Sequence, residues 1–331
     1  MIFSKDRVRP PSPALDPQPG LPWLRRLGFS HMLLQVRRRG QLYLLLALPT
    51  AYILVFHYIP MLGAQIAFRD YSPVDGLWGS EWVGLENFER FFNSYMFERL
   101  IWNTVTLGFY TLVAGFPIPI ILALSLNQVR SRWFKSTVQM VTYAPHFIST
   151  VVMVGLLLQF LNPRFGVAGL VTEAIFGQPV NLLSKPSWYQ HLYVWSDVWQ
   201  HTGFATIIYL AALTTIDPNL HEAALVDGAS KLQRIRHIDI PGILPVTTMI
   251  LILNIGSFIN IGFEKALLMQ NPLNTSVSEI IDTYVYKVGL TSAALDFSYA
   301  TAIGLFKGVI ALALVVLANW LVKKLGQEGL W

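Results

Sequence analysis

A charged pair lies inside one of the apolar stretches of this sequence. Asp197 and His201 are four positions apart, so on a helix they share one face, and Trp199 stands between them. A charged side chain at membrane depth faces other protein or a water-filled path rather than lipid. We therefore expect Asp197, His201 and Trp199 to line a path for a solute. A purely structural hydrogen bond is the favoured alternative for Asp197 itself.

Two further apolar stretches carry polar side chains. Asn254, Ser257 and Asn260 recur at steps of three residues, and they would form one polar stripe able to hydrogen-bond the hydroxyl groups of a solute. Hydrogen bonds between helices would explain this stripe almost as well. Lys307 lies about two turns inside the last apolar stretch. It would either attract an anionic solute, or else extend its amine toward the membrane surface or pack against protein.

The sequence lacks the motifs of common catalytic sites. It has no cysteine, which excludes disulfides, thiolate metal sites and cysteine nucleophiles. No Gly-Lys pair occurs, so there is no phosphate-binding loop for ATP. His221 and Glu222 begin like the zinc-protease motif HExxH, but Leu225 occupies the position of the second histidine. We therefore predict that this chain is not an enzyme and itself holds no metal or cofactor.

The composition is that of a membrane protein. The chain has 331 residues, of which 53% are hydrophobic and 13% charged, and its mean hydropathy is +0.48. Because prolines inside lipid require neighbouring groups that satisfy the freed carbonyls, the prolines in several apolar stretches favour a helix bundle around a cavity. We predict six spanning helices near Leu42–Ile66, Leu100–Gln128, Val138–Leu161, His191–Leu213, Ile240–Phe263 and Tyr299–Val322.

The basic residues predict the orientation of these helices. Most Lys and Arg fall in the N-terminal arm, in the loops after the second and fourth spans, and in the C-terminal tail. The positive-inside rule therefore places both termini in the cytoplasm, and it accounts for the net charge of +5 without a nucleic-acid partner. The expected organisation is a basic, Pro-rich cytoplasmic arm at 1–40, a six-helix transmembrane domain at 41–325 and a tail at 326–331.

Between the fourth and fifth spans, residues 217–238 predict an amphipathic cytoplasmic helix. Asp217 is a suitable N-cap, and Pro218 suits the first helical position. A glycine inside a helix costs about 0.8–1 kcal/mol relative to alanine, so Gly228 indicates either a close approach of another backbone or a sharp bend between two short helices. Such a helix docks into a groove on a partner protein or lies on the membrane surface, and its residues favour both equally.

The stretch EAALVDGASKLQRIRHIDIP resembles the EAA loop of ABC-importer permease subunits. In that pattern the E-A-A triplet is followed by a glycine and then by I-x-L-P, and here Ile240 stands where the family usually has leucine. In the family this loop docks into a cleft of a cytoplasmic ATPase subunit. The resemblance implies that role for Glu222, Ala223, Ala224, Asp227, Gly228, Ala229 and Pro241.

The resemblance covers nearly everything after about residue 40. WVGLENFERFF, FPIPIILALSLNQV, YAPHFIS and TAIGLFKGVIALALVVLANWLVKK are similar to carbohydrate-type permeases, in particular those that import oligosaccharides derived from alginate or other acidic polysaccharides. It implies an all-α, type I ABC-importer permease fold in the bacterial inner membrane. The implied partners are a second permease subunit, two ATPase subunits that bind ATP and Mg, and a periplasmic solute-binding protein. A self-sufficient channel or secondary transporter is the alternative.

Overall fold

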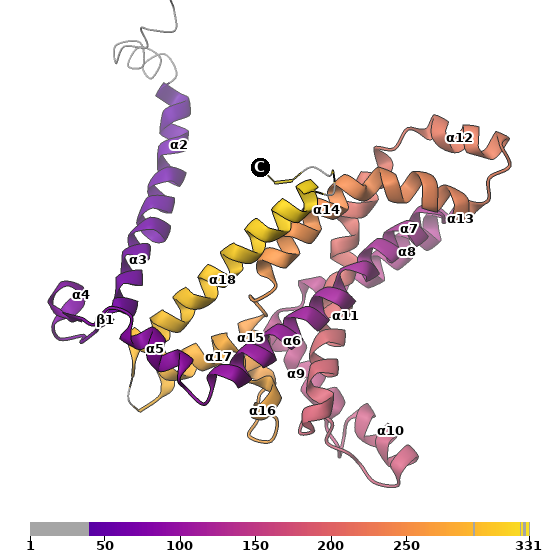
Figure 1. Cartoon of the computed structure of the whole chain (residues 1–331). Coiled ribbons are helices and arrows are strands. Elements are labelled where there is room, and N and C mark those ends of the chain that lie inside the picture. Colours follow the sequence, from indigo (N-terminus) through magenta and orange to yellow (C-terminus); the bar gives the residue numbers. More distant parts are fainter. Residues whose placement is uncertain (1–39, 294, 325, 327–328, 331) are drawn as a thin grey trace, which may run out of the picture. The chain divides into compact units, whose positions relative to one another are not determined.

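The structure is a computed structural model that describes residues 40–293, 295–324, 326 and 329–330 (Figure 1). The predicted basic arm at 1–40 lies outside the described residues except for Gly40, and the predicted tail at 326–331 is described only in part. The chain divides into two compact units, one ending at Gly63 and the other beginning at Ala64.

The first unit contributes most of one long apolar helix. It begins with α2 (Gly40–Ile53), continues through the π-helix η2 (Leu54–Tyr58) and α3 (Ile59–Met61), and leads into the 3-10 helix η3 (Leu62–Phe68). Together these elements form a candidate membrane span, and none of the residues in its most apolar window is buried. This helix corresponds to the predicted first span.

The second unit opens with a small outer hairpin. Strands β1 (Arg69–Asp70) and β2 (Glu81–Trp82) pair in antiparallel fashion around α4 (Gly76–Gly79), and α5 (Glu86–Phe92) follows. Helix α5 covers the ENFERFF part of the stretch WVGLENFERFF. Its buried Asn87 donates from its amide to the backbone oxygens of residues 67 and 69, which ties the helix to the hairpin.

The next two predicted spans differ in how their prolines act. Helices α6 (Phe97–Gly115) and α7 (Pro117–Asn127) run on as one candidate span, since prolines are tolerated in the first turn of a helix. Helix α8 (Arg132–Tyr143) instead ends in the 3-10 turn η4 (Ala144–Phe147), which contains Pro145, and α9 (Thr150–Leu161) leaves at 102°. The predicted third span at Val138–Leu161 thus corresponds to a bent pair of helices, and the break falls at the turn that contains Pro145. Helix α10 (Val167–Phe176) packs on α9.

The following part of the chain contains the longest helix, α11 (Pro186–Thr214), and then α12 (Pro218–Val226), α13 (Lys231–Arg234), the π-helix η5 (Ile235–Asp239) and α14 (Ile240–Ser257). The prediction of one helix over 217–238 is wrong, because a turn at residues 227–230 separates α12 from α13. The predicted fifth span also ends earlier than expected, at Ser257.

A folded segment of residues 263–291 precedes the last span. It contains α15 (Phe263–Met269), α16 (Thr275–Ser278), α17 (Ile281–Tyr286) and the π-helix η6 (Lys287–Thr291), and α18 (Phe297–Lys324) follows it. We call residues 263–291 the inserted segment, because its helices lie between α18 and the pair α6 and α11 at the end of the unit away from α12 (Figure 1).

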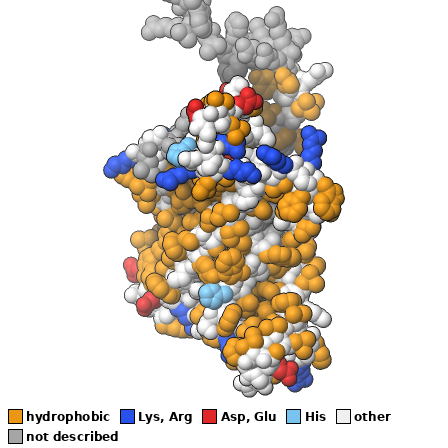
Figure 2. Space-filling view, turned by 90° about the vertical axis from the view of Figure 1, so that its right-hand side faces the viewer, with side chains coloured by type: hydrophobic (Ala, Val, Ile, Leu, Met, Phe, Trp, Pro, Cys, Tyr) orange, Lys and Arg blue, Asp and Glu red, His pale blue; other side chains and the backbone are white. Residues whose placement is uncertain are grey.

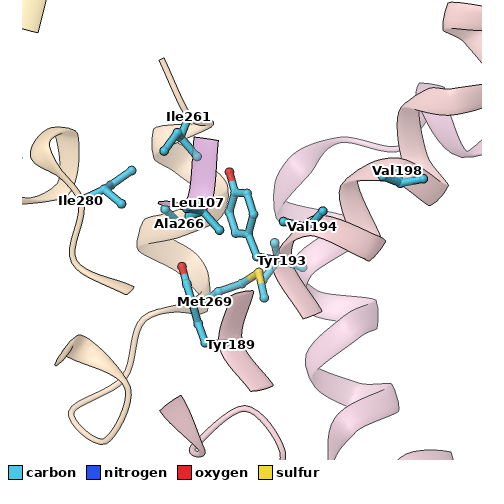
Figure 3. Close-up of a cluster of buried hydrophobic side chains, with 10 residues drawn as sticks. Leu107, Tyr189, Tyr193, Val194, Val198, Ile261, Ala266, Met269 and Ile280 are labelled. Carbon is cyan, nitrogen blue, oxygen red and sulfur yellow. The ribbon is translucent and has the colours of Figure 1, made fainter. Parts of the chain in front are cut away.

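The inserted segment is held by the largest buried apolar cluster (Figure 3). Tyr189, Tyr193 and Val194 of α11 meet Ala266 and Met269 of α15 in this cluster, together with side chains of α6 and α9. Burial of a large apolar side chain contributes about 1.5–3 kcal/mol, so a cluster of this size fixes α15 against α11. Smaller clusters join α5, α6, α17 and α18, and join α7, α11 and α14.

The predicted count of six spans is not exactly matched. Within the described residues, four helices are long and apolar enough to cross a membrane, and the bent pair formed by α8 and α9 would make a fifth. Helix α11 has 29 residues but is not one of them. It carries Gln190, His191, Asp197, Gln200 and His201, which lower its hydropathy; of these Gln200 is buried, whereas His191 and His201 are exposed.

The surface separates apolar and basic side chains. On the face in Figure 2, hydrophobic side chains cover the middle of the molecule, while Lys and Arg gather toward the end that carries α12 and α13. Basic residues stand at the start of α8, in α13 and at the end of α18, and these positions lie toward the same end of the second unit in Figure 1. This clustering agrees with the orientation that the positive-inside rule predicts.

Candidate transport path and coupling loop

A cavity of about 290 Å³ opens between α6, α7, α11 and α14. Apolar and small residues of α6 and α7 form one wall, and polar residues of α11 and α14 form the other. Such a mixture of an apolar surface with a few convergent polar groups is typical of a ligand site.

The polar wall contains most of the residues predicted to line a solute path. Asn254, Ser257 and Asn260 border the cavity, and so do Asp197 and His201 of α11. The stripe does not lie on one helix as predicted, because α14 ends at Ser257 and Asn260 stands in the segment after it. The backbone N–H of Asn260 donates to the Ser257 oxygen at 2.8 Å, which keeps this residue beside the cavity. The contact of these residues with substrate stays a prediction.

Asp197 is held by a lysine from the inserted segment. Lys265 of α15 is only 3% exposed, and its Nζ donates to Asp197 Oδ1 at 3.2 Å and to the backbone oxygen of Tyr193 at 3.0 Å. The same amine lies 4.7 Å from the centroid of the Tyr193 ring. A buried charge needs such partners because desolvation is costly. The structural hydrogen bond favoured for Asp197 is therefore present, although part of its side chain still faces the cavity.

His201 takes its position from the same carboxylate. Its Nδ1 lies 3.5 Å from Asp197 Oδ1 and 3.1 Å from the Asp197 backbone oxygen, so the ring is oriented by its own helix turn. His146, in the turn after α8, lies at 5.5 Å between ring centroids. The wall of the cavity thus carries one acidic side chain that is balanced from behind by Lys265 and flanked by an imidazole.

Two predicted path residues lie elsewhere. Trp199 is 56% exposed and does not border the cavity. Lys307 is 8% exposed and donates to Asp282 Oδ1 of α17 at 2.5 Å. Lys307 therefore does not extend to the membrane surface, since an acidic partner within the protein neutralises it. Of the predicted alternatives, packing against protein is correct.

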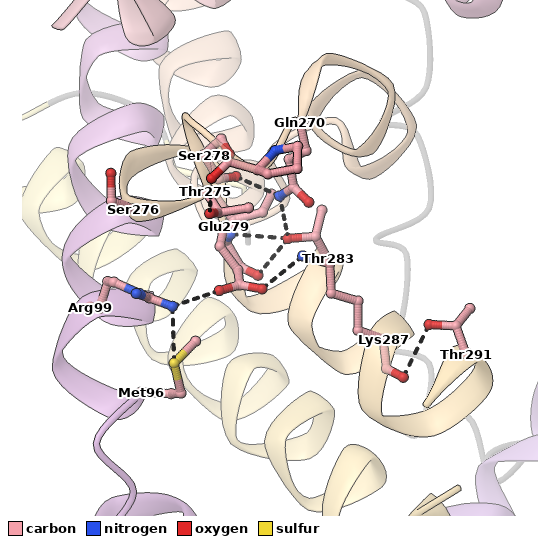
Figure 4. A network of polar contacts seen from close by, with 12 residues as sticks. Met96, Arg99, Gln270, Thr275, Ser276, Ser278, Glu279, Thr283, Lys287 and Thr291 are labelled. Atoms are coloured by element: carbon pink, nitrogen blue, oxygen red, sulfur yellow. Dashed lines mark hydrogen bonds and ion pairs between the residues drawn. The ribbon is translucent and has the colours of Figure 1, made fainter. Parts of the chain in front are cut away.

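A second group of charges fixes the other end of the inserted segment (Figure 4). Glu279 accepts from Arg99 of α6 and from Lys287 of η6, each at 2.8 Å. Asn103 of α6 donates to the backbone oxygen of Glu279 at 2.9 Å. The inserted segment is therefore joined by an ion pair to each of α6, α11 and α18.

The predicted coupling residues form an exposed turn between two helices. Glu222, Ala223 and Ala224 lie in α12, whose N-cap is Asp217, as predicted; its side chain accepts from the Asn219 N–H at 2.9 Å. Gly228 has φ +76°, a left-handed conformation that glycine adopts without steric cost. The sharp bend predicted as one explanation of this glycine is therefore correct.

Local hydrogen bonds explain why the chain turns at Gly228. The Gly228 N–H donates to the Leu225 oxygen at 3.1 Å and the Ala229 N–H to the Ala224 oxygen at 2.8 Å, which is the Schellman pattern of a helix end. Ser230 then starts α13 with a capping box shared with Gln233. The turn thus holds Asp227, Gly228 and Ala229 at an exposed point, and Pro241 stands in the first turn of α14.

Sequence reasoning missed Lys265 and Asp282 as partners of the predicted path residues. The available signal was a charged residue within an apolar run, as Lys265 is in FEKALLM. The partner of Lys265 lies 68 positions away along the chain, and the partner of Asp282 lies 25 positions away.

Comparison with known proteins identifies the family. Residues 115–327 match the family described as binding-protein-dependent transport system inner membrane component. The chain belongs to this family. It is 42% identical over 320 residues to protein LplB of Bacillus subtilis (strain 168), covering 97% of each chain. It is 44% identical over 302 residues to the polygalacturonan/rhamnogalacturonan transport system permease protein YteP of the same organism, covering 91% of this chain and 94% of the relative.

A solved structure shares the fold. The match is a bacterial ABC transporter involved in the import of the acidic polysaccharide alginate, with a TM-score of 0.82, 37% identity, and coverage of 89% of this chain and 99% of that chain. A second structure of the alginate transporter, in complex with a periplasmic protein carrying an alginate pentasaccharide, matches equally well. These findings confirm the predicted resemblance: the chain is an all-α ABC-importer permease subunit of the inner membrane, and it is not an enzyme.

Proposed function

We propose that this chain is a translocation subunit of an ATP-driven importer of uronate-containing oligosaccharides. Residues 41–325 form the permease domain, which encloses the translocation path together with a second permease subunit. A periplasmic solute-binding protein delivers the oligosaccharide, and two cytoplasmic ATPase subunits bind ATP and Mg. The chain itself supplies binding groups, a path and a coupling loop.

The observation that carries this proposal is the cavity between α6, α7, α11 and α14. Asn254, Ser257 and Asn260 offer hydroxyl and amide groups to a sugar, and the apolar wall of α6 and α7 suits the faces of sugar rings. A hydrogen-bonded wall of this kind suits a solute rich in hydroxyl groups.

The charge balance of the cavity supports an acidic sugar. A free carboxylate at Asp197 would repel a uronate, but Lys265 lies directly behind it at 3.2 Å and cancels its charge. His201 adds a positive charge to the wall when it is protonated. Alginate and polygalacturonan, named for two similar proteins, are both polymers of uronic acids.

The turn between α12 and α13 is the proposed contact with the ATPase. Glu222, Ala223, Ala224 and the turn at Gly228 project at the basic end of the molecule, and most of α12 is exposed. An exposed helix with a small, smooth face suits insertion into a groove of a partner. ATP binding would then move the permeases between outward-facing and inward-facing states.

The experiment that tests this function begins with affinity purification of the tagged chain from its native membrane in mild detergent. Mass spectrometry should recover an ATPase and a second permease. The purified complex is then reconstituted in liposomes containing ATP, and uptake of oligouronates is compared with uptake of neutral oligosaccharides of equal length.

Two outcomes would oppose the proposal in different ways. Repeated recovery of the chain alone, together with gradient-driven uptake by it, would establish a self-sufficient channel or secondary transporter. Recovery of the full complex with uptake of neutral oligosaccharides only would keep the importer and reject the uronate substrate.

A further inference from the structure

A buried carboxylate lies at the root of α14, next to the exposed loop. Asp239 is 0% exposed, and two side chains from other elements reach it. Gln128, at the end of α7, donates from Nε2 to Asp239 Oδ2 at 3.1 Å. His221 of α12 places its Nε2 at 3.3 Å from Asp239 Oδ1. The carboxylate therefore joins three elements, α7, α12 and α14.

Helix α12 has little other side-chain contact with the spanning helices. Among its residues only His221 and Ala224 are partly shielded from solvent, and the remaining side chains are exposed. Just before α12, the side chain of Ile216 packs against Gly242 of α14. A Cβ added at Gly242 would lie 2.5 Å from Ile216 Cδ1. Movement of α12 can thus reach α14 through the backbone connections or through His221.

The contact between His221 and Asp239 is incomplete in this conformation. The two atoms are at ion-pair distance, but Asp239 Oδ1 accepts no hydrogen bond from any described residue. An unsatisfied carboxylate oxygen in a buried position is costly, and a small shift of the His221 ring would satisfy it. Both the neutral imidazole with hydrogen on Nε2 and the imidazolium can make this bond. The free energy of the pair therefore changes with the position of α12.

We propose that His221 is a positioning residue that passes the movement of α12 to Asp239, and from there to α14 and α7. Both of those helices contribute to the cavity, Pro119 from α7 and Asn254 and Ser257 from α14. The linkage thus connects the exposed loop to opposite walls of the path. This inference rests on the proposed function in one respect, namely that α12 contacts the ATPase. His221 and Gln128 lie outside the EAA stretch, and Asp239 stands at the unspecified position of its I-x-L-P part, so the inference adds residues to the predicted coupling set.

The test uses the purified complex in liposomes, with ATP hydrolysis and oligouronate uptake measured on the same preparation. His221→Leu removes the hydrogen-bond donor at similar volume, and His221→Gln keeps an N–H donor. We expect His221→Leu to lower uptake per ATP hydrolysed by about tenfold, while the hydrolysis rate changes less than about twofold. His221→Gln should restore most of the ratio. Gln128→Leu should lower it in the same direction.

A matched control separates this role from general damage at the same end of the molecule. Thr214→Val removes a hydroxyl that donates only to the Ala211 oxygen of its own helix, and it should leave the ratio unchanged. An unchanged ratio in His221→Leu would overturn the inference. So would equal losses in His221→Leu and His221→Gln, because those would indicate a requirement for the imidazole at a partner surface. Absence of any ATPase from the wild-type complex would instead reject the proposed function, and this inference with it.

Discussion

The inserted segment and the loop formed by α12 and α13 differ in how many charged side chains they bury. The inserted segment brings Lys265, Glu279 and Asp282 into buried or nearly buried positions, and each has a partner on a different spanning helix. The loop formed by α12 and α13 is mostly exposed, and one buried carboxylate, Asp239, links it to the spanning helices by side chains.

This difference has a physical basis. Breaking an ion pair with a buried member leaves an uncompensated charge, so the pairs of Lys265 with Asp197 and of Lys307 with Asp282 make the inserted segment costly to displace from α11 and α18. The pair with α6 contributes less, because the side chain of Arg99 is 41% exposed. An exposed helix with few contacts moves at little cost, because local stability follows the number of buried contacts. A region that must move with a partner protein therefore needs to be exposed and to have few buried contacts, as the loop formed by α12 and α13 does.

The largest expected effect comes from removing a cation from the inserted segment. Lys265→Met leaves Asp197 partly buried without its lysine, and breaking a buried pair costs about 3–5 kcal/mol. We expect a clear fall in the thermal unfolding temperature of the detergent-solubilised protein. The exposed Lys185→Met should change it little.

A second substitution distinguishes lost pairing from lost volume. If Asp197→Asn is added to Lys265→Met, no uncompensated charge remains, so part of the lost stability should return. A double variant that is as unstable as the two single effects added together would show that the pair does not hold the segment.

The sequence predicted the polar residues of the cavity better than their partners. Helical spacing was enough to bring Asp197 and His201 to one face, and the stripe at Asn254 and Ser257 to another, because those relations are local. The pairs with Lys265 and Asp282 depend on how the inserted segment folds back, which no local periodicity records. The same holds for Asp239, whose partners come from α7 and α12.

Local sequence signals also predicted the structure of the coupling loop only in part. The N-cap Asp217 and the bend at Gly228 follow from residue chemistry and were predicted. The division into α12 and α13 was predicted only as one of two explanations of Gly228, because the apolar spacing continues through the turn. The Schellman hydrogen bonds at Gly228 and the capping box at Ser230 override that spacing.

The next effect tests the exposed end. Gly228→Ala places a Cβ on a left-handed residue and costs about 1–2 kcal/mol locally, although none of the described residues would contact the Cβ. Gly228→Trp adds a bulky side chain at the proposed ATPase contact. We expect Gly228→Trp to abolish uptake with normal membrane insertion, and Gly228→Ala to retain part of it. Wild-type uptake by Gly228→Trp would contradict the assigned coupling loop.

A smaller effect concerns the polar wall of the cavity. Asn254→Ala removes one amide, and a hydrogen bond to a neutral group contributes about 0.5–1.5 kcal/mol. We expect the KM for oligouronate uptake to rise by about two- to tenfold, with the ATPase rate preserved. Thr248→Val, which removes a hydroxyl bonded to its own helix in α14, is the matched control. Equal KM values for the two variants would remove Asn254 from the path.

The smallest effect tests whether α13 is held by its cap alone. Ser230 accepts from the Gln233 N–H at 3.3 Å, and Gln233 Oε1 accepts from the Ser230 N–H at 2.7 Å. Ser230→Ala removes the first of these bonds and should cost about 1 kcal/mol. Because α13 has only four residues, we expect faster amide hydrogen exchange in α13 and unchanged exchange in the inserted segment. Unchanged exchange in α13 would mean that its neighbours, rather than the capping box, hold it, and the exposed end would then be more rigid than its few contacts imply.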